Sequence, residues 1–208
     1  MLIDITRTMG IDTLVYPGDT PHKLSKVDDM AAGGSHNLSR MECSPHWGTH
    51  LDAPSHFIED GFTIDELPLE RFHLRAHVID TLDATAVRPD HLEGWGIEPG
   101  DAVLFRTTNT FLPREEPSPV FVGLTIEATH KLVEMEVSLV GIDYLTVEQT
   151  MDNPDSPVHM ILLGAGMLIL EEANLTQVAE GTFELTCFPL KLYNTEASPV
   201  RAVLEPIE

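Results

Sequence analysis

Short apolar runs separated by turn-forming segments dominate the hydrophobic pattern of this chain. Most of the runs have the length and composition of β-strands, at residues 2–6, 38–43, 76–82, 101–108, 138–143, 167–171, 182–192 and 198–206. Helical spacing is confined to three segments: 88–96 with Pro89 in its first turn, 124–136 with Thr125 as the N-cap, and 158–163. Residues 14–21 and 111–120 are rich in proline and other turn formers, which predicts two ordered loops.

This mixture of many strands and few helices predicts the fold class. We expect one α/β domain over residues 1–208, built on a mixed sheet or an open barrel with a few flanking helices. A length of 208 residues suffices for a single sizeable core. The loop at 111–120 could instead link two domains, but neither half has enough elements of its own.

The acidic composition of the chain argues against two classes of binding partner. The chain has 34 acidic and 12 basic residues, a formal net charge of −22, which argues against nucleic acid and anionic membranes. No apolar run approaches the roughly 18–20 residues of a membrane span, and the N-terminus lacks the features of a signal peptide. Cys43 and Cys187 form no C-x-x-C pair, so we expect reduced thiols and a cytoplasmic protein.

The segment "HWGTHLDAPSH" at residues 46–56 holds the candidate chemistry. A helix is disfavoured by its glycine and proline, and an extended chain is favoured instead. In an extended chain, six residues would point the same way: His46, Gly48, His50, Asp52, Pro54 and His56. A lone histidine would be read as a surface residue, whereas three with an aspartate at this spacing favour a metal site for Zn, Mn or Fe.

Strand geometry adds a condition to this metal site. Along a straight strand His46 and His50 would lie about 13 Å apart, too far for two imidazoles to bind one ion. The chain must therefore bend between them, and Gly48 is the residue that tolerates such a bend. The segment by itself supplies only part of a site.

The same segment fits the pattern H-x-G-T-H-x-D-x-P-x-H at every fixed position. It resembles the signature of the cyclase-like family of metal-dependent hydrolases, which includes bacterial kynurenine formamidases and isatin hydrolases. Further similarity covers residues 15–21 ("VYPGDTP"), 140–148 ("VGIDYLTVE"), and 169–192 with 197–204. The resemblance implies the swivelling β/β/α fold of this family.

The resemblance also implies roles for individual residues. His46, His50 and Asp52 resemble the ligands of a first metal ion; Asp52 would bridge to a second ion bound by His159, and Glu171 would contact both. Glu172 is the neighbouring alternative, but strand alternation would point it the other way. His56 resembles the catalytic acid/base of the family.

Two aromatic residues bear on the substrate. Tyr16 stands where the formamidases carry a tryptophan that lines the substrate pocket, so an aromatic ring is kept and a hydroxyl is added. Trp47 occupies a variable position of the motif, and we expect it to pack in the core rather than to line the pocket.

The function implied by the resemblance is hydrolysis of a small aryl formamide. The best single substrate is N-formyl-L-kynurenine, giving L-kynurenine and formate in tryptophan catabolism, with two divalent ions, Zn or Mn, as cofactors. One alternative is hydrolysis of another small cyclic amide or lactone, such as isatin; another is a non-catalytic metal- or ligand-binding module. Relatives also imply a homo-oligomer, either a dimer or a tetramer.

Overall fold

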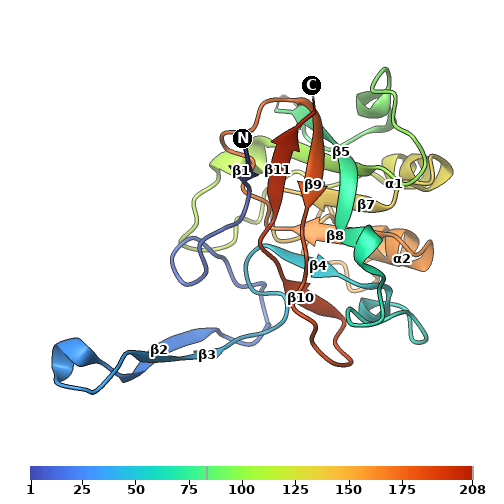
Figure 1. Ribbon diagram of the computed structural model, residues 1–208. Coiled ribbons are helices and arrows are strands. Elements are labelled where there is room, and N and C mark those ends of the chain that lie inside the picture. The colour runs from blue at the N-terminus through green and yellow to red at the C-terminus, as the bar shows by residue number, and fades with distance from the viewer. Residues whose placement is uncertain (83, 208) are drawn as a thin grey trace.

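A strongly curled mixed sheet is the framework of the protein. The computed structural model describes residues 1–82 and 84–207. Within these residues, nine strands form one sheet in the order β1-β11-β9-β5-β6-β7-β8-β4-β10 (Figure 1). Its strands are β1 (Ile3–Asp4), β4 (His50–Asp52), β5 (His73–Thr81), β6 (Ala102–Thr107), β7 (Leu139–Ile142), β8 (Leu168–Glu171), β9 (Gly181–Thr186), β10 (Ala197–Pro199) and β11 (Val203–Pro206). β5 to β8 pair in parallel, and the other neighbours pair antiparallel.

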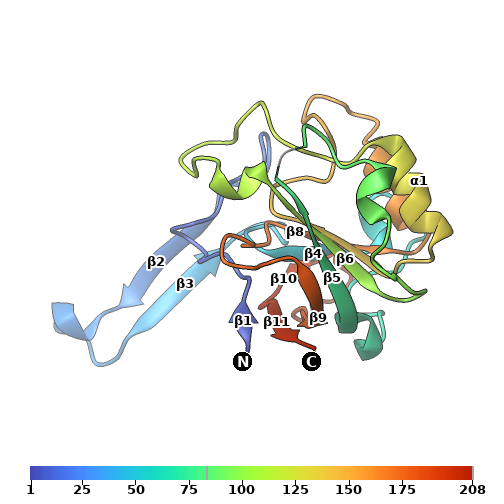
Figure 2. The same ribbon diagram turned by 90° about the horizontal axis from the view of Figure 1, so that it is seen from above.

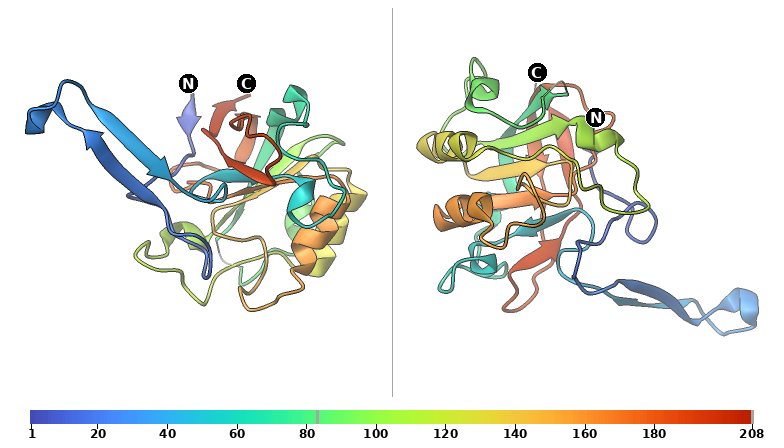
Figure 3. Two further views of the ribbon diagram at one scale, coloured as in Figure 1. Left: turned by 90° about the horizontal axis from the view of Figure 1, so that it is seen from below. Right: turned by 180° about the vertical axis from the view of Figure 1, so that it is seen from behind.

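The strand residues alternate between two apolar cores, one on each face of the sheet. Val78 and Leu104 belong to the core inside the curl, whereas Ile79 and Phe105 belong to the core on the opposite face. This alternation follows from the two-residue period of a strand. The second core is covered by α1 (Ile126–Glu134) and α2 (Pro157–Gly164), which lie on the same side of the sheet (Figure 3).

Both α-helices begin at signals present in the sequence. The Thr125 hydroxyl accepts a hydrogen bond from the backbone N–H of Ala128, which confirms the predicted N-cap of α1. Pro157 opens α2. The described residues also contain short 3₁₀ turns at Met30–Ala32, Pro54–His56, Leu69–Phe72, Pro89–Leu92 and Thr108–Phe111. No helix in the described part of the chain is long and apolar enough to cross a bilayer.

A separate two-stranded hairpin extends away from the sheet (Figures 1 and 2). We call this hairpin the arm; it consists of β2 (Lys23–Asp28), β3 (Leu38–Glu42) and the turn between them. Its strands are almost wholly exposed, with five large apolar side chains among the exposed residues: Leu24, Val27, Met30, Leu38 and Met41. The arm therefore adds nothing to either core of the sheet.

The predicted α/β class with a mixed sheet is confirmed, and the misplaced elements have physical reasons. Strand 38–43 exists as β3 but belongs to the arm, and its partner β2 was missed because "KLSKVD" has little apolar alternation. The single strand expected at 198–206 is two strands, because β10 pairs with β4 and β11 pairs with β9. The segment expected as a helix at 88–96 is a 3₁₀ turn over Pro89–Leu92.

Candidate metal centre

The bend required before β4 lies at Gly48. This residue has a φ of +74°, and a Cβ built on it would meet Thr13 Cγ2 at 2.9 Å. Backbone conformation and space therefore both favour glycine here. The bend brings the rings of His46 and His50 to a centroid separation of 5.0 Å, which agrees with the geometric expectation for two neighbouring ligands.

The segment after β4 is not extended, contrary to the sequence interpretation. β4 comprises only His50–Asp52, and Pro54 then opens a 3₁₀ turn that ends at His56. The fixed φ of proline suits the first position of such a turn. The turn places the ring of His56 at a centroid distance of 4.3 Å from His46 and 6.0 Å from His159.

Strand pairing places the motif opposite Glu171. β4 runs antiparallel to β8 with His50 opposite Glu171. Leu51 points into the core inside the curl, so its neighbours His50 and Asp52 point to the helix-covered side. There they meet His159 from the first turn of α2.

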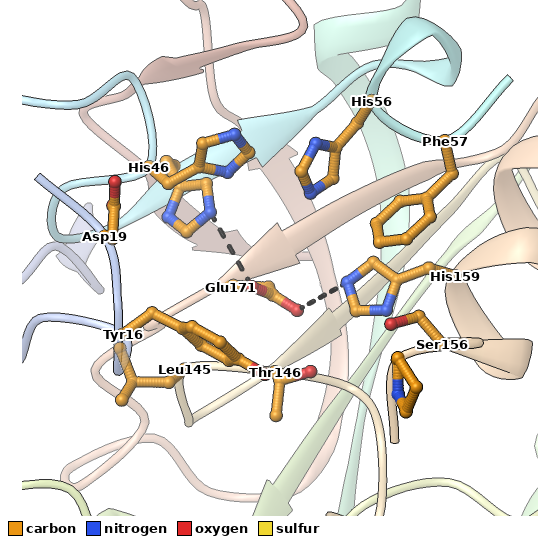
Figure 4. A pocket seen from close by; sticks show the side chains of 12 residues that line it. Tyr16, Asp19, His46, His56, Phe57, Leu145, Thr146, Ser156, His159 and Glu171 are labelled. Carbon is orange, nitrogen blue, oxygen red and sulfur yellow. Dashed lines mark ion pairs between the residues drawn. The ribbon is translucent and has the colours of Figure 1, made fainter. Parts of the chain in front are cut away.

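His159 completes a compact group of imidazoles and carboxylates (Figure 4). Its Nε2 atom lies 3.3 Å from Glu171 Oε1 and 3.8 Å from Asp52 Oδ2. His50 Nε2 lies 3.4 Å from Asp52 Oδ1 and 3.6 Å from Glu171 Oε2. Separations of this size are those expected between ligand atoms that share an ion about 2.0–2.2 Å from each of them.

The ligand atoms form two overlapping groups that share one aspartate. His46, His50 and Asp52 make the first group, and Asp52, His159 and Glu171 make the second; within each group the atoms lie within 4.8 Å of one another. His50 Nε2 and both Asp52 oxygens are buried without a hydrogen-bond partner. Buried polar atoms normally have partners, so these unpaired atoms fit a bound cation. The cluster has the composition and spacing of a divalent-metal site.

Each candidate histidine is held at its other ring nitrogen by an oxygen outside the cluster. His50 Nδ1 lies 2.7 Å from the Gly48 carbonyl, and His159 Nδ1 lies 3.0 Å from Glu148 Oε1. His46 Nε2 lies 3.3 Å from Glu196 Oε1. Such acceptors fix the tautomer and orientation of metal-binding imidazoles.

The two supporting carboxylates differ in burial. Glu148 is 4% exposed, and the same Oε1 atom also accepts a hydrogen bond of 2.9 Å from the His159 backbone N–H. The Glu196 side chain is 38% exposed. Neither glutamate was identified from the sequence, because nothing near either one in the chain indicates which histidine it will meet.

The carboxylates give the cluster a strong preference for positive charge. Burial alone would lower the pKa of His46 and of His159, but Asp52 outweighs it at His46, and Glu148 and Glu171 outweigh it at His159. The pKa of each rises to about 10. Burial would raise the pKa of Asp52, but the adjoining imidazoles hold it well below its usual value.

His56 has the opposite behaviour. Burial lowers its pKa to about 4; the negative charge of Asp52 opposes this shift, and the positive charge of His46 and His159 adds to it. The imidazole is therefore neutral near pH 7 and able to accept a proton. His56 belongs to neither group of ligand atoms, which leaves it free for proton transfer.

Glu172 points away from the cluster, as strand alternation predicts. It has a φ of +57° and forms an ion pair with Arg114, and it is fully buried. Its backbone carbonyl accepts a hydrogen bond of 2.7 Å from the Thr49 hydroxyl. Glu172 therefore anchors the segment that precedes β4 and the loop that carries Arg114.

A cavity of about 350 Å³ opens onto the cluster. It is lined by Tyr16, Asp19, His46, His50, His56, Phe57, Leu145, Thr146, Pro154, Ser156, His159 and Glu171. The Tyr16 hydroxyl donates a hydrogen bond of 3.2 Å to the Met151 carbonyl, which leaves the ring facing the cavity (Figure 4). Trp47 is absent from the lining; it is buried and donates to the Thr13 hydroxyl, in agreement with core packing.

All seven residues singled out from the sequence are thus brought to one place. Five of them form the cluster, and His56 and Tyr16 line the cavity above it. Their roles in binding and catalysis stay predictions. The cavity residues Phe57, Thr146 and Ser156 were not foreseen, because they carry no sequence signal that distinguishes them from other loop residues.

Comparisons with known proteins agree with this geometry. The Cyclase family model matches residues 3–149. A kynurenine formamidase from Salinibacter ruber is 38% identical over 208 residues, covering 98% of this chain and 96% of the relative.

Solved structures of hydrolases also match over nearly the whole chain. A potential metal-dependent hydrolase with cyclase activity superposes with a TM-score of 0.85 at 29% identity, covering 100% of this chain and 98% of the other. Isatin hydrolase A from Labrenzia aggregata, bound to benzyl benzoate, superposes with a TM-score of 0.85 at 27% identity, covering 100% and 94%. With its motif, its fold and its cluster in agreement, this chain belongs to the Cyclase family.

Proposed function

We propose that the protein is a metal-dependent amide hydrolase that converts N-formyl-L-kynurenine and water to L-kynurenine and formate. One observation carries the proposal: two overlapping groups of ligand atoms share Asp52, and a neutral histidine lies beside them at the floor of a cavity. The choice of substrate is supported by the full-length similarity to a kynurenine formamidase. A role in tryptophan catabolism is part of this proposal.

Two divalent ions, Zn or Mn, are the proposed cofactors. His46, His50 and Asp52 would hold one ion, and Asp52, His159 and Glu171 would hold the other. Imidazole and carboxylate ligands suit both metals. When bound, such ions supply an acidified water and polarise the carbonyl group of the substrate.

The residues of the chain supply proton transfer and orientation. His56 accepts a proton on its neutral imidazole as water adds to the formyl carbon, and then donates that proton to the arylamine nitrogen as the C–N bond breaks. Protonation matters because an amide anion is a very poor leaving group. Tyr16 and Phe57 offer aromatic surface to the aryl ring of the substrate.

A second candidate reaction is ring opening of isatin or another small cyclic amide or lactone. The structural match to isatin hydrolase A fits this reaction but does not favour it over formamide hydrolysis. The candidate ligands would be the same in each case, so the difference lies in the cavity. A non-catalytic metal- or ligand-binding module is the remaining alternative, and it would bind metal without turnover.

The proposal is tested by elemental analysis of the purified protein together with assays on N-formylkynurenine and isatin. We expect two equivalents of Zn or Mn per chain and faster turnover of the formamide. Faster turnover of isatin would transfer the proposal to the second reaction. Metal without turnover of either compound, or of a panel of related amides and lactones, would support the binding module.

We further propose that the protein forms a homo-oligomer through the arm, most simply a dimer. An isolated two-stranded hairpin is at best marginally stable, and this arm exposes apolar residues including Leu24 and Met41, which are cross-strand partners. Light scattering after size exclusion tests this assembly. We expect the double variant Leu24→Lys/Met41→Lys to be smaller than the wild type; an unchanged mass would exclude the arm as the contact.

A cytoplasmic location is proposed as well. Cys43 and Cys187 are both free thiols, and burial raises the pKa of Cys187 to about 12. Unpaired thiols are usual in reducing compartments. Fractionation of the producing cells tests this location, and recovery of the protein outside the cytoplasmic fraction would contradict it.

A further inference from the structure

We propose that Asp19 recognises an ammonium group on the substrate, so that the enzyme selects aryl formamides that carry a primary amine. This inference rests on the proposed function and adds the feature by which the substrate is distinguished. It concerns the wall of the cavity rather than the cluster at its floor. The argument uses the charge of the lining residues, the surroundings of Asp19 and the chemistry of the candidate substrates.

The cavity lining has an uneven charge. Apart from Glu171, which belongs to the cluster, Asp19 is the one carboxylate among the residues that line it. No lysine or arginine contributes to this lining in the described part of the chain. The whole protein has a net charge of −22, which further favours cations over anions near the entrance.

The surroundings of Asp19 leave its charge available. Its backbone N–H donates a hydrogen bond of 3.0 Å to the Tyr16 carbonyl, so the two residues share one turn. In the view of Figure 4, Asp19 and Ser156 lie on opposite sides of the cavity. The Asp19 side chain accepts only a local hydrogen bond, from the backbone of Thr20, and it pairs with no cationic side chain among the described residues.

Asp12, a few residues earlier in the chain, provides a contrast. Its Oδ2 atom lies 3.4 Å from the Arg7 guanidinium, and its Oδ1 atom lies 3.9 Å from that of Arg114. The charge of Asp12 is thus compensated within the protein. Both aspartates are half-buried, but Asp19 lines the cavity and has no cationic side chain as an ion-pair partner among the described residues.

The candidate substrates differ in the group that Asp19 would meet. N-formylkynurenine carries an ammonium and a carboxylate at the end of the acyl side chain, which is attached to the ring ortho to its formamide. An ammonium group can donate a charge-assisted hydrogen bond to Asp19, whereas the substrate carboxylate finds no lysine or arginine in the lining. Isatin has no ammonium. The cavity wall therefore favours N-formylkynurenine over isatin, and it selects for the ammonium group of the substrate rather than for its carboxylate.

Three formamides separate the contribution of the substrate ammonium group from that of its carboxylate. N-formylkynurenine has both charged groups, N-formylkynuramine keeps the ammonium without the carboxylate, and 2′-formamidoacetophenone has neither. With the metal-loaded wild type we expect kcat/KM for N-formylkynuramine to equal or exceed that for N-formylkynurenine. The neutral compound is expected to be about tenfold poorer, through KM, the effect of one charge-assisted hydrogen bond.

Asp19→Asn tests the residue itself. We expect its loss of kcat/KM on the two ammonium compounds to exceed its loss on the neutral compound by about tenfold, with metal content unchanged. Glu93→Gln is the matched control, because it removes the same charge from an exposed residue that is not part of the cavity lining. This control is expected to retain the wild-type ranking of substrates.

The outcomes distinguish this inference from the function on which it rests. Equal losses on all three compounds in Asp19→Asn would make Asp19 a structural residue and overturn the inference. A wild type that treats the neutral compound as well as the others would overturn it too. If the wild type hydrolyses none of the three formamides, the proposed function itself fails.

Discussion

The two halves of the candidate metal centre are built in different ways. The first half, with His46 and His50, comes from one short segment, and its supporting carboxylate Glu196 is 38% exposed. The second half, with His159 and Glu171, joins a helix to a strand, and its supporting carboxylate Glu148 is buried. The first half is thus encoded locally and has a partly exposed supporting carboxylate, whereas the second exists only once α2 has packed on β8.

This difference has consequences for how firmly each half is held. A buried carboxylate interacts more strongly with its partner than an exposed one, because water screens the exposed pair. Glu148 also makes two contacts with His159, to its ring and to its backbone, whereas Glu196 makes one contact with His46. We therefore expect the second half to depend more on its supporting carboxylate.

Removing the residue that the halves share should have the largest effect. In Asp52→Asn the bridging carboxylate is replaced by an amide with one acceptor oxygen, so neither group keeps its full ligand set. We expect loss of both ions and a fall in kcat/KM on the order of 10³-fold or more. Elemental analysis and the formamidase assay measure the two effects; retention of two ions would show that the halves are independent.

His56 separates proton transfer from metal binding. It lies closer to His46 than to His159 but belongs to neither group. We expect His56→Gln to retain its ions and to lose about 10²–10⁴-fold in kcat, the range for a missing general acid/base. Loss of an ion from this variant would instead identify His56 as a ligand of the first half.

Glu148→Gln tests the support of the second half. The amide keeps the size of the side chain but removes the charge that holds His159 Nδ1. We expect one of two ions to bind about 10–100-fold more weakly, as measured by competition with a chelator. Equal weakening of both ions would contradict the assignment of Glu148 to one half.

Glu196→Gln makes the same change in the first half. Since Glu196 is partly exposed and its contact with His46 is longer, the expected weakening is below about tenfold and affects the other ion. The same competition assay compares the two variants directly. If Glu196→Gln weakens binding more than Glu148→Gln, burial does not determine the strength of support.

Asp143, at the end of β7 beside the strand that carries Glu171, should affect the site least. Burial raises its pKa to about 7, although Thr107 donates hydrogen bonds to both of its oxygens. Between these two pKa values the folded state binds a proton that the unfolded state has lost. The free energy of unfolding should therefore fall as the pH rises from about 4 to about 7, by at most about 1.4 kcal/mol per pH unit. Asp143→Asn should lack this fall in denaturant titrations, with activity near wild type; an identical pH dependence would contradict the shift.

Much of the first half could be predicted because its information is contiguous. The spacing of His46 and His50 and the glycine between them require a bend, and the structure has it at Gly48. The extended conformation expected through His56 was wrong, because Pro54 begins a turn that local alternation does not indicate. His159 and Glu171 entered only through family resemblance, since pairing between distant segments is invisible in one sequence.

The remaining residues depend on the arrangement of the elements in space. Glu148 lies in the loop after β7, and Glu196 directly precedes β10. Each glutamate contacts its histidine only because the fold brings that segment close to the cluster. The arm was missed as a unit for a related reason: β2 has the composition of a loop, and only its pairing with β3 makes it a strand. Local patterns thus predict elements, whereas contacts between elements need the fold.

The pairing of β4 with β8 has one more consequence, which concerns strand register. His50 faces Glu171 across this pair, and Leu51 faces Leu170. A slip by one residue would turn the leucines toward the ions and the charged groups into the apolar core. Because only the native register presents a complete set of ligands, bound metal stabilises that register over its neighbours by mass action. Metal binding would then select the native register of β4 against β8 over registers shifted by one residue.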